Sequence, residues 1–384
     1  MTELSPDALM EAACERTGLD QFGDEDFIEA LQHFTDACIK DGRVSSAGAG
    51  QIAETLVAKL ISRLRFEDEL RCHPEILEEQ IVSPLFLIGA GRVGSTKMHR
   101  LLATAADIQS LPFWQLQDPA RPAESDRTGT DPRRVACEAF CEQIKTGLPQ
   151  LFAAIEPVAT EPDEEVHLLD LTFMQFYFSA LAYTPSYFDW IFDQDWTPPY
   201  EYLKKLLQYL QWQNGTAGKP MLLKGPFHTP YIEILARLFP DAKFVQIHRD
   251  PVTCAASLGK VAWMLQSISQ GTATKEEYGR LLEDYLTNAL VDNVSLRDSF
   301  PKDRIADYYY EDVLADAPAL AQEIFRFWGQ PLTDADLDAM RSWEADNRQH
   351  KLGKFEYSLE EMGVDRQRME TALSPYMQRF YGTS

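Results

Sequence analysis

A glycine-rich turn between an apolar segment and a helix-forming segment constrains this chain more than any other feature. Residues 86–102 read FLIGAGRVGSTKMHRLL, in which Gly89 and Gly94 stand five positions apart. That spacing is typical of the phosphate loop GxxxxGKS, which joins a buried strand to a helix. Ser95 occupies the position of the loop lysine, and Thr96 follows it. The segment therefore predicts a strand, a turn and a helix in an α/β fold.

A turn of this kind can bind an anion. It directs consecutive backbone N–H groups and the N-terminus of the following helix at one point, which suits a phosphate or sulfate group. The hydroxyls of Ser95 and Thr96 and the forked guanidinium of Arg92 add further donors. A glycine-rich turn can also serve only as a tight connection, so the segment alone leaves both interpretations open.

A second buried segment also ends in charged residues. Residues 242–258 read AKFVQIHRDPVTCAASL, with Arg249 after the apolar run and Ser257 in the helix that Pro251 favours. The carboxyl ends of parallel strands meet at one edge of a sheet, so Arg249 is expected beside the glycine-rich turn. The letters HRD also occur in protein kinases, but Ala255 stands where the kinase motif requires Asn. The two strand ends therefore predict a ligand with two anionic groups.

These motifs and several others resemble the bacterial branch of the sulfotransferases that use 3′-phosphoadenosine 5′-phosphosulfate (PAPS). Members of that family typically carry an opening motif GxPR(S/T)G(S/T)T, followed by a helix with LLHRLL. The matching segments keep the family's order, and they are GAGRVGST (89–96), MHRLL (98–102), KGPFH (224–228), FPDA (239–242), HRDP (248–251), YED (310–312) and YSLE (357–360). The resemblance implies sulfotransferase activity and an α/β fold, a parallel sheet flanked by helices with a phosphate-loop-like 5′-phosphosulfate loop.

The resemblance assigns the sulfuryl donor to residues at both strand ends. Arg249 and Ser257 would hold the 3′-phosphate. Lys351 and Lys354, shortly before the closing motif YSLE (357–360), would fold over the nucleotide. Sulfuryl transfer from PAPS needs no bridging magnesium, which accounts for the missing loop lysine and predicts a site without metal. The 5′-phosphosulfate would lie in the loop formed by Gly91, Arg92, Val93, Gly94, Ser95 and Thr96.

Two residues of this loop depart from the family pattern. Gly91 replaces a proline, and Val93 replaces a serine or threonine. Glycine adds conformational freedom to the unfolded chain. Valine removes a hydroxyl donor, which weakens anion binding by about 0.5–1.5 kcal/mol if that donor makes one hydrogen bond. Lys97, where relatives often carry an apolar residue, either restores positive charge to the loop or points to solvent.

Sulfuryl transfer needs a base beside the acceptor hydroxyl and positive charge beside the leaving phosphate oxygen. His228 is the predicted base, since imidazole titrates near neutral pH. Lys224 and Arg92 are predicted to neutralise the sulfuryl group and the leaving phosphate. Glu164 and Glu165, in an acidic stretch before the acceptor region, are the alternatives for the base. These residues also have a structural interpretation, as a hydrogen-bonded core histidine and as carboxylates in the first turn of a helix.

The acceptor is predicted to be a small apolar molecule. Aromatic residues are dense from Phe173 to Trp212, and helical spacing places many of them in the core. Their density also predicts an aromatic pocket for a phenol or another hydroxyl compound. With 60 acidic against 36 basic residues and a net charge of −24, the surface repels polyanionic glycans, nucleic acids and acidic membranes.

Four apolar segments alternate with helix-forming segments, which predicts a parallel sheet wrapped by helices. They lie at about residues 84–89, 220–224, 243–248 and 304–309. Residues 1–80 are predicted to form a helical N-terminal extension, and residues 81–384 the α/β sulfotransferase domain. No apolar run reaches the length of a membrane span and the N-terminal segment is acidic, so a cytoplasmic protein without membrane insertion is expected. The sequence leaves homodimer formation open.

Two other classes of protein remain as alternatives. A phosphate-loop phosphotransferase shares the strand-turn-helix arrangement but is disfavoured by the missing lysine. A non-catalytic nucleotide-binding relative of the sulfotransferases is consistent with Gly91 and Val93. Magnesium dependence distinguishes the first alternative from a sulfotransferase. The effect of substituting the base on PAPS-driven turnover distinguishes the second.

Overall fold

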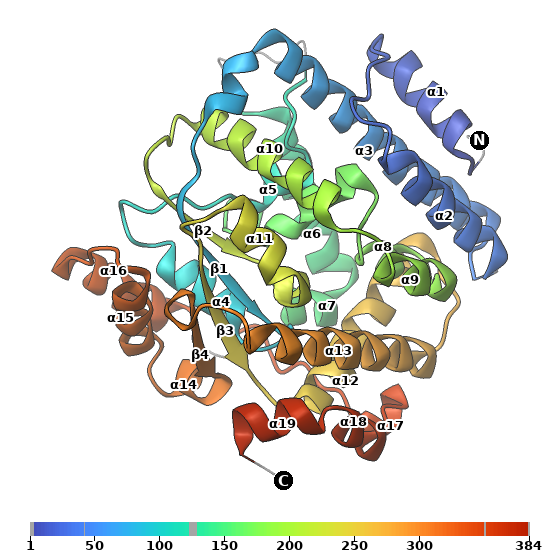
Figure 1. The fold of residues 1–384 in the computed structure, drawn as a ribbon. Helices are drawn as coiled ribbons and strands as arrows, with labels where there is room; N and C mark the ends of the chain where they lie inside the picture. The colour runs from blue at the N-terminus through green and yellow to red at the C-terminus, as the bar shows by residue number, and fades with distance from the viewer. Residues whose placement is uncertain (1–3, 42, 123–128, 349–350, 383–384) are drawn as a thin grey trace.

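A parallel sheet of four strands lies among helices and carries the glycine-rich turn at one edge (Figure 1). The computed structural model describes residues 4–41, 43–122, 129–348 and 351–382. The predicted fold class and the four predicted strands are confirmed. The strand order is β2-β1-β3-β4, in which β1 spans Val82–Gly89, β2 Pro220–Lys224, β3 Lys243–His248 and β4 Ile305–Tyr309.

The register of the sheet brings the carboxyl ends of its strands together. Leu87 in β1 pairs with Lys224 in β2 and with Val245 in β3. His248, the last residue of β3, pairs with Tyr309, the last residue of β4. The inner strands β1 and β3 are buried along almost their whole length, as expected where helices cover both faces of a parallel sheet. The turn after β1 and the charged residues that follow β2 and β3 therefore lie at the same edge.

Helices make up most of the remaining described chain. Before β2 they are α1 (Pro6–Thr17), α2 (Phe27–Lys40), α3 (Ser46–Cys72), α4 (Ser95–Leu102), α5 (Phe113–Gln117), α6 (Pro132–Gly147), α7 (Pro149–Ile155), α8 (Phe178–Leu181), α9 (Pro185–Phe192) and α10 (Thr197–Asn214). After β2 they are α11 (Ile232–Leu238), α12 (Pro251–Leu265), α13 (Lys275–Arg297), α14 (Tyr310–Ala315), α15 (Ala317–Trp328), α16 (Asp334–Asp346), α17 (Leu359–Met362), α18 (Arg366–Ala372) and α19 (Ser374–Tyr381). Short 3-10 helices are η1 (Pro74–Glu78), η2 (Glu165–Thr172), η3 (Pro226–Tyr231), η4 (Gln266–Ser269) and η5 (Lys302–Arg304).

The predicted N-terminal helices form as α1, α2 and α3 and share the core of the α/β part. Arg63 of α3 lies over the rings of Phe27 and Tyr202, with 4.2 and 4.3 Å to the ring centroids. It also donates hydrogen bonds to the carbonyls of Phe22 and Leu171. The division of the chain at residue 80 stays a prediction. None of the helices in the described ranges is long and apolar enough to cross a membrane.

An ion network ties β3 and β4 to α13 and α19, with the side chain of His248 0% exposed and that of Asp307 30% exposed. The ring of His248 lies 2.6 Å from Tyr376 Oη through Nδ1 and 2.9 Å from Asp307 Oδ1 through Nε2. Arg297 donates to both carboxylate oxygens of Asp307, at 2.8 and 2.6 Å. Burial alone would raise the pKa of Asp307. The hydrogen bonds from His248 and Arg297, with the guanidinium charge, outweigh it and lower that pKa to about 2.

This network predicts an acid-sensitive contribution to stability. A carboxylate whose pKa is lower in the folded than in the unfolded chain stabilises the fold above its unfolded pKa of about 4. We expect Asp307→Asn to lower the free energy of unfolding at pH 7 by about 1–3 kcal/mol. Urea unfolding should show the difference from the wild type shrinking as the pH falls from about 4 towards 2. The exposed Asp303→Asn serves as control, and a difference that stays constant with pH contradicts the prediction.

Candidate functional site

The glycine-rich turn after β1 uses left-handed backbone conformations. Gly91 and Gly94 have φ values of 73° and 83°, and Arg92 has a φ of 58°. Glycine adopts this region without steric cost, whereas a residue with a Cβ atom adopts it rarely. Gly94 caps α4, whose first turn carries Ser95 and Thr96. Since the first N–H groups of a helix have no partner within it, the turn directs donors to the edge of the sheet, as anion binding requires.

The side chain of Val93, one of the two departures from the family pattern, is fully buried and belongs to the hydrophobic core. Ser95 in the same turn and Lys224 beside it are buried as well, so burial alone does not place Val93 outside the anion site. The expected effect of the missing hydroxyl on anion binding stays a prediction.

Arg92, Arg249 and Ser257 meet beside the turn. The Arg92 side chain donates from Nε to Ser257 Oγ at 3.2 Å and from Nη1 to the carbonyl of Ala154 at 2.9 Å. Arg249 donates from Nη1 to the Arg92 carbonyl at 2.6 Å. The structure thus brings together Arg92, which the sequence assigned to the 5′-phosphosulfate of PAPS, and Arg249 and Ser257, which it assigned to the 3′-phosphate. The Arg92 side chain therefore lies on the Ser257 side of the turn.

The two guanidinium groups form a local positive charge. Neither Arg92 nor Arg249 has a carboxylate within ion-pair distance among the described residues. Burial, and after it the neighbouring Arg249 charge, lowers the pKa of Arg92, against an opposing effect of Tyr357. Arg249 donates to Tyr357 Oη at 3.2 Å and lies 4.3 Å from the ring centre of Tyr310. Such a pair of cations is stabilised by an anion with more than one negative oxygen.

The two lysines of the closing segment lie differently. Lys351 pairs with Glu156 at 2.7 Å and donates to Asn347 at 2.6 Å. Lys354 is exposed. The predicted folding of these lysines over a nucleotide stays a prediction. The closing segment does reach the site through Tyr357, which the sequence singled out only as part of a motif.

A second cluster surrounds Lys224 at the end of β2. Its side chain is 1% exposed, and Nζ lies 2.6 Å from Glu164 Oε1, 3.2 Å from Thr96 Oγ1 and 3.6 Å from Asp163 Oδ1. Lys224 therefore joins the first turn of α4 to the acidic stretch. Burial would raise the pKa of Asp163, but the charges of Lys224 and Arg100 lower it overall. A buried ammonium held between carboxylates and a loop hydroxyl is placed to contact an anion in the turn.

His228 is enclosed in the same region. Its side chain is 0% exposed, with Nδ1 at 2.7 Å from Tyr200 Oη and Nε2 at 2.9 Å from Glu165 Oε1. Glu165 Oε2 also accepts from the backbone N–H of Lys224 at 2.7 Å. Burial would raise the pKa of Glu165, but the hydrogen bond and charge of His228 lower it. The side chains of His228 and Glu165 are 0% and 1% exposed, so the geometry gives an acceptor hydroxyl no access to either group as the base.

Glu164 is more accessible than either. Its side chain is 16% exposed, and Tyr177 donates a hydrogen bond from Oη to Glu164 Oε2. The sequence did not single out Tyr177, Tyr200 or Asp163 for a role, although each lies in or near a segment that it named. No local sequence pattern predicts the contact of Tyr200 with His228, because the two residues are 28 positions apart in the chain.

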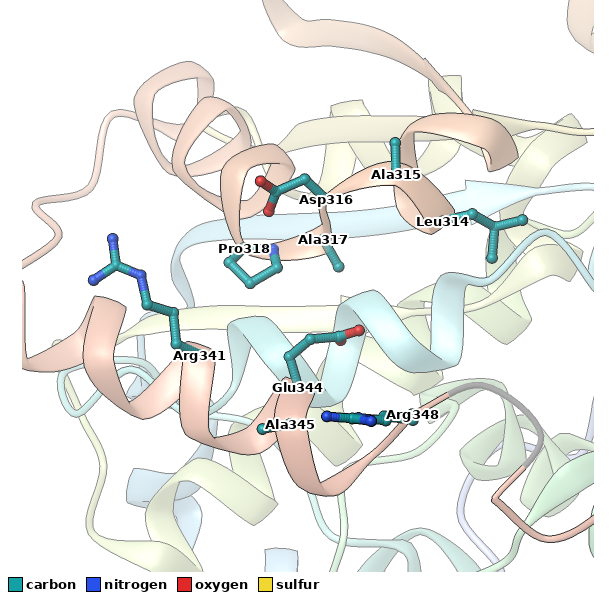
Figure 2. Close-up of a pocket in the computed structure, with 9 residues that line it drawn as sticks. All are labelled: Leu314, Ala315, Asp316, Ala317, Pro318, Arg341, Glu344, Ala345 and Arg348. Carbon is teal, nitrogen blue, oxygen red and sulfur yellow. The ribbon is translucent and has the colours of Figure 1, made fainter.

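Lys97 points away from the anion loop. Its ammonium pairs with Glu344 of α16 at 2.7 Å, so it neither adds charge to the loop nor extends freely into solvent. Glu344 also lines a cavity of about 350 Å³ between the α14–α15 connection and α16 (Figure 2). Arg341 and Arg348 project into the same space. The contact ties the first turn of α4 to α16.

In the described ranges, no group of three or more His, Cys, Asp or Glu residues is arranged to hold a metal ion. His99 of α4 is buried behind the Lys224 cluster. Burial, and after it the charge of Lys224, lowers its pKa to about 4. His99 is therefore neutral at pH 7 and adds no charge to the site.

Comparisons with known proteins identify the class of protein. A family model described as the sulfotransferase family matches residues 84–334. Since the match covers more than half of the chain, this chain belongs to the sulfotransferase family. The resemblance inferred from the sequence motifs is confirmed, and the phosphotransferase alternative is set aside.

Mycobacterial proteins are among its relatives. The chain is similar to the crystal structure of sulfotransferase STF9 from Mycobacterium avium, with a TM-score of 0.86, 26% identity and coverage of 98% of this chain and 97% of that one. For sulfotransferase STF1 from Mycobacterium tuberculosis H37Rv the TM-score is 0.82, with 27% identity over 97% of this chain and 100% of that one. The omega-hydroxy-beta-dihydromenaquinone-9 sulfotransferase Stf3 of Mycobacterium bovis is 24% identical over 168 residues, which span 42% of each chain.

Proposed function

We propose that this protein moves the sulfuryl group of PAPS to a hydroxyl of an apolar or aromatic small molecule. The observation that carries the proposal is the position of the Lys224 cluster beside the loop. Lys224 contacts Thr96 of the loop at 3.2 Å and Glu164 at 2.6 Å. One ammonium group therefore lies between the proposed binding site of the phosphosulfate and a carboxylate that can act as the base. The relative Stf3 is named for a hydroxylated menaquinone derivative, which supports a small apolar acceptor.

Different residues are proposed to bind the two anionic groups of the nucleotide. The first turn of α4, with Ser95 and Thr96, is proposed to hold the 5′-phosphosulfate. Arg249 and Ser257 are proposed to hold the 3′-phosphate, with Arg92 between the two groups because it contacts Ser257 and Arg249. The predictions of no metal and no nucleic-acid partner stay as predictions.

The transfer needs one proton acceptor. A carboxylate takes the proton of the acceptor hydroxyl as its oxygen forms a bond to sulfur. The bond from sulfur to the bridging phosphate oxygen breaks, and 3′-phosphoadenosine 5′-phosphate leaves. Lys224 and Arg92 offset the charge that develops on the leaving oxygen. We assign the carboxylate to Glu164, because it is partly exposed and touches Lys224, whereas His228 is fully enclosed.

This proposal predicts nucleotide selectivity. The product 3′-phosphoadenosine 5′-phosphate should stabilise the protein without magnesium, by about 2.7 kcal/mol at a hundred times its Kd. ADP and ATP lack the 3′-phosphate and should stabilise it much less. Thermal unfolding of wild type and Arg249→Ala measures the effect, with the variant expected to lose most of its response. Arg134→Ala, an exposed arginine on α6, is the control. Stabilisation only by ATP with magnesium contradicts the proposal.

The assignment of the base predicts different outcomes at two positions. Glu164→Gln keeps the size of the side chain and removes its basicity. PAPS-driven turnover of a phenol should therefore fall at least about a hundredfold, while binding of 3′-phosphoadenosine 5′-phosphate survives. His228→Gln leaves Tyr200 and Glu165 with altered buried partners, so its main effect should be a lower melting temperature.

Turnover assays and thermal unfolding on the same preparations distinguish a catalytic base from a residue that only stabilises the fold. Turnover that persists in Glu164→Gln but is lost in a stably folded His228→Gln would assign the base to His228. Loss of nucleotide binding in Glu164→Gln would show a structural role for that carboxylate. Glu161→Gln, in the same acidic stretch, is a matched control that should leave turnover unchanged.

A further inference from the structure

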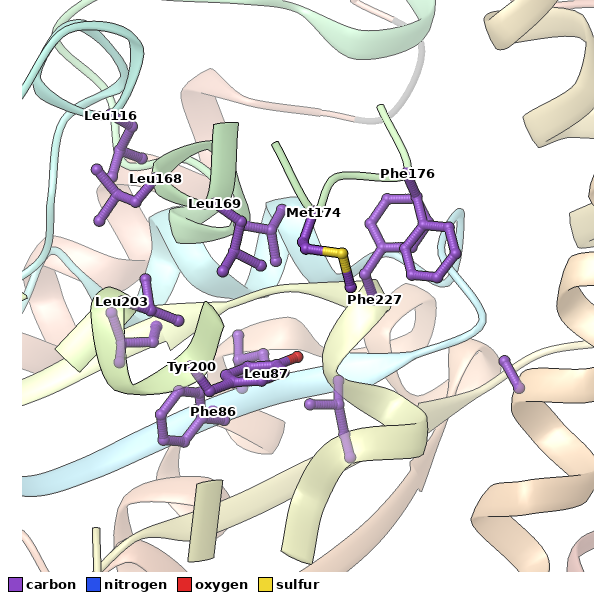
Figure 3. Packing of buried hydrophobic residues seen from close by; sticks show 14 of the residues in the cluster. Phe86, Leu87, Leu116, Leu168, Leu169, Met174, Phe176, Tyr200, Leu203 and Phe227 are labelled. Carbon is purple, nitrogen blue, oxygen red and sulfur yellow. The ribbon is translucent and has the colours of Figure 1, made fainter. Parts of the chain in front are cut away.

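An aromatic cluster lies beside the Lys224 and Glu164 contact. The rings of Phe176 and Phe227 are stacked with centroids 5.1 Å apart, and both appear side by side in Figure 3. Tyr177 meets Phe227 edge-on at 4.8 Å and donates from its hydroxyl to Glu164. The cluster therefore forms an apolar surface that leads directly to the proposed base.

Tyr285 of α13 belongs to this cluster but has an unpaired hydroxyl. Its ring lies 5.0 Å from each of Phe176 and Phe227, and the residue is 2% exposed. Its Oη is buried, with no hydrogen-bond partner in the part of the chain that the structure describes. A buried polar group without a partner is costly and rare in folded proteins. Tyr278, seven positions earlier on the same helix, is buried too but donates to the carbonyl of Ser179 at 2.9 Å.

The protonation state of Tyr285 makes its hydroxyl a donor. Burial raises its pKa well above the ordinary value, and the nearby Tyr231 and the charge of Glu164 add to the rise. The phenol is therefore neutral throughout the working range of an enzyme, and its proton is available for a hydrogen bond. The surrounding rings of Phe176, Phe188, Phe192 and Phe227 offer no acceptor of their own.

We propose that the Tyr285 hydroxyl donates a hydrogen bond to a second oxygen of the sulfuryl acceptor. The enzyme would then prefer apolar hydroxy compounds that carry an ether or carbonyl oxygen apart from the hydroxyl that is sulfated. This inference rests on the proposed function. Glu164 takes the proton at one end of the acceptor, the aromatic rings contact its apolar body, and Tyr285 binds its other oxygen. The rings of Phe176, Phe188 and Phe227 around the Tyr285 hydroxyl are buried in the main core.

Two pairs of phenols test this inference. 4-Methoxyphenol and 4-ethylphenol differ chiefly by one ether oxygen, and 3-methoxyphenol and 3-ethylphenol form a second pair. In the wild type, kcat/KM should favour the methoxy compound of at least one pair by about tenfold, the effect of one hydrogen bond of about 1.4 kcal/mol. Tyr285→Phe should abolish that preference while keeping the ethyl compound as a substrate. Equal rates within both pairs for the wild type, or a preference that persists in Tyr285→Phe, would overturn the inference.

Stability provides a second readout that needs no acceptor. Tyr285→Phe removes a hydroxyl without a partner, so the melting temperature should rise by about 2 °C. Tyr278→Phe, on the same helix, removes a hydroxyl that has a partner, and its melting temperature should fall. A fall in Tyr285→Phe would show a hidden partner and overturn the inference. Equal rates within both phenol pairs for a wild type that still binds 3′-phosphoadenosine 5′-phosphate refute only this inference, whereas a wild type that does not bind that nucleotide refutes the proposed function as well.

Discussion

The buried ammonium of Lys224 is the interaction on which the arrangement of the site depends. A charge removed from water is tolerated only when it is paired and hydrogen-bonded. Lys224 meets this condition through Glu164 and Asp163 on one side and Thr96 on the other. The pairing of β1 with β2 places Lys224 beside Leu87, a few residues before the turn. The sheet register therefore fixes the distance between the anion loop and the acidic stretch.

The site separates two kinds of positive charge. Lys224 is neutralised by carboxylates, while Arg92 and Arg249 contact carbonyl, hydroxyl and aromatic groups. The chain as a whole carries a net charge of −24, so the overall field repels an anionic ligand, while Arg92 and Arg249 attract it locally. Local arrangement, and not overall composition, decides where a doubly anionic nucleotide can bind.

Much of the fold could be predicted from the sequence because its signals are local. Apolar segments that alternate with helix-forming segments located all four strands, and β2 and β3 have the predicted boundaries. The glycine spacing located the anion loop. The orientation of Arg92 could not be predicted, because its left-handed backbone at a non-glycine position is set by contacts with Arg249 and Ser257.

The limits of prediction are clearest around His228. Its distance from Lys224 and its residue type suggested a base, but the sequence does not show that Tyr200 and Glu165 close over both ring nitrogens. Those partners come from α10 and η2, far apart in the chain. Similarly, the pairing of Lys97 with Glu344 joins segments separated by 247 positions. Contacts between residues so far apart in the sequence follow from the packing of helices and not from any motif.

The φ of 73° at Gly91 has a consequence for comparing this loop with its relatives. Proline fixes φ near −65°, so the backbone path followed here is closed to the proline that the family motif carries. Gly91 is thus not a loosened copy of that motif but part of a different local path. Arg92 next to it is also left-handed, and the two residues together turn the chain. Exchanging a single residue between this loop and a proline-bearing one would therefore transfer the side chain but not the backbone conformation that orients it.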